Sequence, residues 1–213
     1  MRFFKMGKGA YGEGDVFLGI KMPQARALAQ RYADKLPFSD ITELLQSPYH
    51  EERLIALLLL VHLFKTGNLV QQKKIFTFYL THTASINNWD LVDLSAHKIV
   101  GRYLEKNPRK ILYTLARSHN LWERRIAIIA TAHFISQNDF AETLAIAHLL
   151  LTDTHDLIHK AVGWMLREVG KKSIHTEETF LKKYYMQMPR TMLRYAIEKF
   201  PEEKRQRYLK GTV

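Results

Sequence analysis

The sequence contains no cysteine in its 213 residues. This absence excludes a disulfide framework and thiolate metal sites, and it fits a reducing cytoplasm. Long apolar runs are also missing. The longest, residues 54–64, is interrupted by His62, whereas a membrane-spanning helix needs about 20 apolar residues. Residues 1–8 show no apolar segment of the secretory type. We therefore predict a cytoplasmic protein with no membrane partner.

Motifs for metal binding and nucleophilic catalysis are scarce as well. The histidines form no H-E-x-x-H motif, although His155 and His159 are spaced to share one helix face. No G-x-S-x-G element is present, so serine-hydrolase chemistry is not indicated. Residues 7–12 match G-x-G-x-x-G, but no β-branched strand precedes them, as a phosphate-binding loop requires. We predict neither a metal nor a nucleotide cofactor, and interpret these glycines as part of a flexible arm suited to lie on a polyanion.

Negative charge is in short supply. The chain has 32 Lys and Arg against 21 Asp and Glu, which gives a formal net charge of +11. An excess of this size favours nucleic acid or another polyanion as a partner, although it says nothing about the fold.

The sequence pattern predicts an all-α protein. Five of the ten glycines lie in the first twenty residues, which predicts a loop or arm over residues 1–22. After it the apolar residues recur at spacings of three and four, without a sustained alternation of period two. We expect one domain over residues 1–213, with short connections and antiparallel neighbours. The predicted helices cover residues 23–35, 39–46, 50–65, 69–81, 89–104, 108–118, 121–136, 139–151, 154–170, 176–187 and 190–200.

A basic or aromatic residue recurs about every 35 positions, and each one opens an apolar helical stretch. A fixed period of this length is typical of a helical solenoid, in which equivalent side chains stack along one face. The sequence therefore predicts five or six helix pairs with a cationic column that suits a regularly charged polymer. The members of this column are Arg53, Trp89, Arg125, Lys160 and Arg194.

Trp89 is the one member of this column that is not cationic. Asp93 lies four residues further on, so the two side chains share one helix face. Trp164 follows Lys160 at the same distance, which predicts equivalent positions for Asp93 and Trp164 on one groove. A tryptophan at helical spacing more often packs in the core. An aspartate, however, rarely lies on an apolar helix face unless it forms an ion pair or has a functional role. A structural ion pair between Asp93 and Arg125 is the alternative.

Four segments together resemble the AlkD family of bacterial DNA alkylation-repair glycosylases, which are built from HEAT-like repeats. The resemblance runs from about Phe3 to the C-terminus. It implies a right-handed α-solenoid of five to six HEAT-like repeats with a concave basic groove, and it implies that the helix preceding the arm in characterised relatives is lacking here. Asp156 and Leu157 stand where at least one relative has aromatic residues, which bears on lesion preference. The four segments are residues 17–23, 88–93, 120–125 and 160–168.

The resemblance also implies roles for individual residues. The family's catalytic aspartate falls on Asp93, its two cleft tryptophans on Trp89 and Trp164, and its DNA-binding arginine on Arg125. The implied activity is excision of positively charged N3- or N7-alkylated purines from duplex DNA, without a snug base pocket, by a monomer with no obligate protein partner. Further DNA contacts are expected from the remaining cations, namely Arg53, Lys160, Arg167 and Arg194.

Two other functions stay open at this point. The same cationic column would serve a non-catalytic protein that binds branched or distorted DNA. A HEAT-like scaffold for protein partners is disfavoured, because its groove would be more apolar and less basic.

Overall fold

The computed structural model describes residues 4–5 and 7–213, which form helices joined by short connections. Within these residues no β-strand is present, and Val16 and Tyr49 form an isolated β-bridge. The all-α prediction is confirmed for the described chain. The chain divides into two compact units, residues 1–103 and 104–213. The single HEAT-like domain over residues 1–213 stays a prediction, as does the arm over residues 1–22, of which 1–3 and 6 lie outside the described residues.

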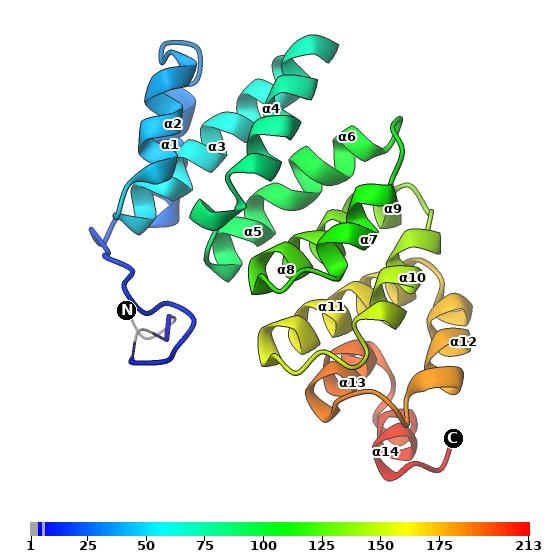
Figure 1. The fold of residues 1–213 in the computed structure, drawn as a ribbon. Coiled ribbons are helices and arrows are strands. Elements are labelled where there is room, and N and C mark those ends of the chain that lie inside the picture. Colours follow the sequence, from blue (N-terminus) through cyan, green and yellow to red (C-terminus); the bar gives the residue numbers. More distant parts are fainter. Residues whose placement is uncertain (1–3, 6) are drawn as a thin grey trace. The chain divides into compact units, whose positions relative to one another are not determined.

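Helix α3 is the centre of the first unit. It lies between the α1 and α2 pair and helices α4 and α5, and it contacts all four (Figure 1). Leu57, Leu59 and Leu60 of α3 are fully buried on different sides of the helix, as expected for a helix that is apolar all round. The helices of this unit are α1 (Met22–Tyr32), α2 (Phe38–Gln46), α3 (His50–Thr66), α4 (Leu69–Thr81) and α5 (Trp89–Ala96).

Helix α5 does not end in a regular turn. It continues into a π-helical segment, His97–Gly101, and then into the short helix α6 (Arg102–Leu104), so helical structure fills the predicted range 89–104. A π-helical turn inside a longer helix is frequently found at functional sites. The irregularity therefore draws attention to α5.

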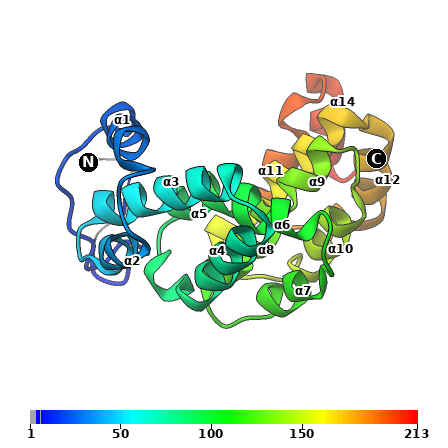
Figure 2. The same cartoon turned by 90° about the horizontal axis from the view of Figure 1, so that it is seen from above.

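Helix α11 is the centre of the second unit. It lies between α8 and α13 in Figure 1, and it also contacts α9, α10 and α12. Helices α7 and α10 lie side by side in Figure 2. The helices of this unit are α7 (Lys110–Ala116), α8 (Leu121–Ala130), α9 (Ala132–Ser136), α10 (Ala141–Leu149), α11 (Asp156–Lys172), α12 (Ile174–Tyr184), α13 (Arg190–Ala196) and α14 (Glu202–Lys210).

Helices α11 and α13 approach each other closely at Gly163. A Cβ atom at this position would lie 2.4 Å from the Met192 carbonyl oxygen and 2.5 Å from the Tyr195 Cβ. No side chain fits in that space, so the position of α13 against α11 depends on the glycine.

The loop before α1 is docked on α3. Glu51 is buried, and its carboxylate accepts hydrogen bonds from the backbone N–H groups of Leu18, at 2.9 Å, and Gly19, at 2.8 Å. Gly19 adopts a left-handed conformation with φ of 83°, which favours glycine. The His50 N–H donates to the Val16 carbonyl at 2.8 Å. These hydrogen bonds hold the end of the loop against the start of α3.

The glycine-rich motif at residues 7–12 is not shaped to hold phosphate. Its N–H groups donate within the chain: Ala10 to the Gly7 carbonyl at 2.9 Å, Gly12 to the Lys5 carbonyl at 3.0 Å, and Gly9 to the Glu13 carboxylate at 2.6 Å. These donors are therefore used by the turn itself, and Glu13 places a negative charge where a phosphate would need donors.

Candidate functional site

The first turn of α5 carries the tryptophan and aspartate that the sequence singled out. Asn88 is the N-cap residue, and its side-chain oxygen accepts a hydrogen bond from the Trp89 N–H at 2.8 Å. Trp89 is the first residue of the helix and Asp93 follows one turn later. Both side chains are half-buried. The structure therefore brings these two residues together on one helix face, as predicted.

The carboxylate of Asp93 contributes to the raised pKa of a buried neighbour, Tyr79. Burial raises the pKa of the fully buried Tyr79, and the negative charge of Asp93 raises it further, although the hydrogen bond between Tyr79 and Ser95, at 2.8 Å, works in the opposite direction. Tyr79 belongs to α4, so the field of Asp93 extends into the α4 and α5 packing. A charge this close to a dry core acts at lower effective dielectric than one in water.

An aromatic cluster from the arm covers part of Trp89. The ring of Phe4 stacks on Trp89 with centroids 5.6 Å apart, and on Phe17 with centroids 4.9 Å apart. Phe17 in turn stacks on His50 at 4.7 Å. Sequence reasoning missed this cluster, because the phenylalanines lie in the segment interpreted as a flexible arm.

Helix α11 carries two more of the predicted residues, Lys160 and Trp164. The Lys160 ammonium forms an ion pair with Asp156 at 2.7 Å, one turn earlier. The Trp164 side chain is half-buried, and its indole N–H donates to Glu168 at 3.0 Å. Trp164 is thus held by a carboxylate rather than packed as an ordinary core residue.

The predicted DNA contacts Arg167 and Arg194 differ in exposure. Arg167 is paired with Glu198 and lies 3.7 Å from Glu168, and its side chain is 17% exposed. Arg194, on α13, is exposed. Of the two, Arg194 is the one that already faces solvent.

Arg53 and Arg125 are both buried and engaged within the chain. Arg53 is 5% exposed, and its guanidinium donates to Asp15 at 2.5 Å and to the Ser47 and Pro48 carbonyls at 2.9 and 3.1 Å. Arg125 is 4% exposed and donates to the Leu157 carbonyl of α11 at 2.5 Å. Their DNA-binding roles stay predictions. Each arginine would have to exchange an internal contact for a phosphate.

A second arginine repeats the contacts of Arg53. Arg124 donates to the Ser118 and His119 carbonyls, both at 3.0 Å, and to Asp153 at 2.6 Å. The spacing column had matched Arg53 with Arg125 instead. The signal was present in the sequence, because each of these two arginines follows a serine by six positions.

The helix starts correct the register of the repeats. Trp164 lies nine residues after its N-cap residue, whereas Asp93 lies five after its own, so their predicted equivalence is wrong. Instead Asp93 occupies the position that holds a cation in three other helices. The residues at this position are Asp93, Arg125, Lys160 and Arg194, after the N-cap residues Asn88, Asn120, His155 and Pro189.

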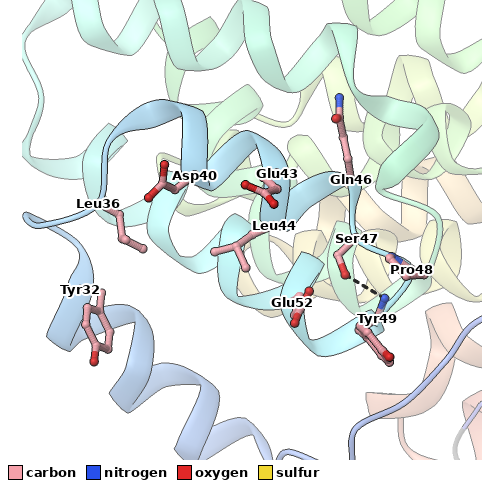
Figure 3. A pocket seen from close by; sticks show the side chains of 10 residues that line it. All are labelled: Tyr32, Leu36, Asp40, Glu43, Leu44, Gln46, Ser47, Pro48, Tyr49 and Glu52. Carbon is pink, nitrogen blue, oxygen red and sulfur yellow. Dashed lines mark hydrogen bonds between the residues drawn. The ribbon is translucent and has the colours of Figure 1, made fainter.

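A hollow of about 810 Å³ lies elsewhere, between α1, α2 and the start of α3. Figure 3 shows three carboxylates among its lining side chains, those of Asp40, Glu43 and Glu52. Their charge opposes the approach of a phosphate backbone. This hollow is therefore unsuited to a polyanion.

Within the described residues, no group of three or more His, Asp or Glu side chains is arranged to hold a metal ion. Across the same residues, no helix has the length and apolar character that crossing a membrane requires.

These features define an all-α protein with a tryptophan and aspartate pair at one helix start and cations at the matching position of others. The chain belongs to the DNA alkylation repair enzyme family, whose model matches residues 1–200. No curated protein matches it in sequence.

Solved structures share the fold. A predicted DNA alkylation repair enzyme from Enterococcus faecalis is 18% identical with a TM-score of 0.70, over 90% of this chain and 92% of that one. AlkD2 from Streptococcus mutans is 20% identical with a TM-score of 0.62, over 90% of this chain and 95% of that one. The smu.31 protein from Streptococcus mutans UA159 is 22% identical with a TM-score of 0.58, over 85% and 93%. At these identities the likeness concerns the fold.

Proposed function

We propose that the protein is a DNA glycosylase that excises positively charged N3- or N7-alkylated purines from duplex DNA. Family membership supports a function in DNA repair. The position of Asp93 is the observation that supports the specific glycosylase activity. An acidic side chain stands beside Trp89 at a helix position that elsewhere holds a cation. In a chain of net charge +11, that placement needs a reason other than DNA affinity.

The chemistry of the lesion supplies that reason. A purine alkylated at N3 or N7 is positively charged and leaves readily, and its departure gives the deoxyribose the character of an oxocarbenium ion. A carboxylate stabilises this cation electrostatically, and the electron-rich faces of Trp89 and Trp164 do so through cation–π attraction. Asp93 would also orient the attacking water as a general base. Neither a metal nor a nucleotide is needed for these steps.

The phosphate backbone would be bound by the cations of the second unit. Lys160 and Arg194 share one helix register, and Arg167 lies further along α11. We propose that they line the concave groove of a right-handed solenoid of HEAT-like repeats, and that Arg53 and Arg125 act in binding after exchanging an internal contact. The protein would act as a cytoplasmic monomer. Recognition would depend on backbone contacts and on the charge of the lesion.

The test is release of free base from a duplex carrying 7-methylguanine, with DNA affinity measured on the same samples. Asp93→Asn keeps the size of the side chain and removes its charge, so base release should fall by about two orders of magnitude or more while affinity holds or rises. Asp40→Asn, in the acidic hollow on α2, removes the same charge away from α5 and should leave release unchanged.

Two results would count against the proposal. Base release that survives Asp93→Asn removes Asp93 from the catalytic centre. Tight binding by the wild-type protein without release from 7-methylguanine or 3-methyladenine duplexes favours the second candidate, a non-catalytic protein that binds branched or distorted DNA.

A further inference from the structure

Asp15, in the loop before α1, joins α3 to the cap of α5. Its side chain is 4% exposed, and one carboxylate oxygen accepts from Arg53 at 2.5 Å. The other accepts from the Asn88 side-chain amide at 2.9 Å. Burial disfavours the charged form, but His50, Asn88 and Arg53 outweigh it and lower the pKa of Asp15, so the group is a carboxylate at neutral pH.

The contact with Asp15 fixes which way the Asn88 amide faces. Its nitrogen donates to Asp15, so its oxygen is directed to the Trp89 N–H, where it accepts at 2.8 Å. Asn88 is fully buried, and no water is needed to satisfy either end of the amide. One hydrogen-bond chain therefore runs from the arm through the cap residue to the backbone of Trp89.

A second chain holds the next residue of α5. His50 is buried, its Nε2 lies 2.9 Å from Asp90, and its Nδ1 lies 3.6 Å from Asp15, beyond hydrogen-bond distance but close enough for electrostatic attraction. Burial lowers the pKa of His50, but Asp15 and Asp90 outweigh it and raise the pKa to about 9. The imidazolium is thus present at neutral pH between two carboxylates.

We propose that Asp15 is a positioning residue for the candidate active site. Through Asn88 and His50 it sets the first turn of α5, and with it the placement of Trp89 and Asp93, so that the arm is part of the machinery although it touches no reacting atom. This inference rests on the proposed glycosylase function. A displacement of about 1 Å in such a group can cost on the order of 100-fold in rate.

The decisive variants exchange donor and acceptor across the Asp15 and Asn88 contact. Asp15→Asn alone removes the charge that orients the amide. Asn88→Asp alone keeps an oxygen to cap Trp89 but sets two carboxylates against each other. Each should lower the single-turnover rate of 7-methylguanine release about 10- to 100-fold, with DNA affinity changed by less than about threefold. The double variant Asp15→Asn/Asn88→Asp restores a donor and an acceptor and should recover most of the lost rate.

A matched control separates positioning from loss of stability. Asp139→Asn weakens an aspartate and arginine pair of similar length, 2.6 Å to Arg109, in the other unit. It should lower the melting temperature without changing the single-turnover rate. If Asp15→Asn changes only the melting temperature, as this control does, or if the double variant recovers no rate, the positioning role is refuted.

Trp89 fluorescence tests the positioning role of Asp15 without depending on catalysis. In a Trp122→Phe/Trp164→Phe background the only remaining tryptophan is Trp89. There Asp15→Asn should increase acrylamide quenching of its emission, and the double exchange should reverse the increase. Unchanged quenching refutes the positioning of Trp89. Wild-type protein that releases no base refutes the proposed function alone, and the quenching result then decides whether Asp15 positions Trp89.

Discussion

Replacing Gly163 by alanine tests how closely α11 and α13 pack against each other. The added methyl group would meet the Met192 carbonyl oxygen at 2.4 Å and the Tyr195 Cβ at 2.5 Å. Overpacking costs about 1–3 kcal/mol, and the upper end applies because a backbone atom, not a flexible side chain, must move. Alanine regains about 1 kcal/mol of helix propensity. The net loss is about 2 kcal/mol, or about 4–8 °C in melting temperature for a chain of this length.

Thermal unfolding followed by circular dichroism measures this loss. Gly7→Ala is the control, because a Cβ there has no heavy atom within 4 Å and should leave the melting temperature unchanged. Since Arg194 lies on α13, Gly163→Ala should also weaken DNA binding. If Gly163→Ala melts with the wild type or above it, α13 can shift without cost and the reasoning is refuted.

Two further predictions concern buried charges. Burial, and then the charge of Glu178, raises the pKa of Glu177 to about 8 from 4.5, so its contribution to stability is full below about pH 4.5 and is lost as pH rises towards 8. Glu177→Gln should therefore gain in melting temperature over the wild type between pH 5 and pH 8, whereas the exposed Glu203→Gln should not, and a pH-independent difference would contradict this sign. Arg125→Ala should lower the melting temperature, because it removes a buried donor to Leu157, and should reduce the slope of DNA affinity against salt by about one. An unchanged slope would limit Arg125 to a structural role.

Most of the fold could be predicted from apolar spacing and proline positions. The α3 run predicts a buried helix because leucine dominates every face of it, and Pro23 lies within the first turn of α1, where its missing N–H costs nothing. Predicted ends fall within about one turn of those observed. The interruptions were not predictable: the π-helical segment after α5 and the break between α8 and α9 depend on packing rather than on local propensity.

Helix α14 was missed for a physical reason. Only Tyr208 of its residues is buried, so the sequence has no apolar stripe that would predict this helix. The terminal signals were nevertheless in the sequence: Pro201 precedes the helix, Glu202 and Glu203 occupy its first turn, and Gly211 ends it in a left-handed conformation with φ of 75°. A short polar helix can therefore be predicted from its capping residues even when it has no apolar face.

The same lesson applies to Asp93. A fixed period identifies the repeats, but the repeats differ in length and the period is only their average length. Successive N-cap residues, Tyr49, Asn88, Asn120, His155 and Pro189, are separated by 39, 32, 35 and 34 positions, so counting from Arg53 drifts out of register before it reaches α5. The caps restore the register, because an asparagine side chain bound to the first N–H groups marks the start of α5 and of α8. In that register the acid of α5 stands at the position that holds a cation in α8, α11 and α13. A chain that only binds DNA gains from a cation there, whereas a reaction that passes through a sugar cation gains from a carboxylate.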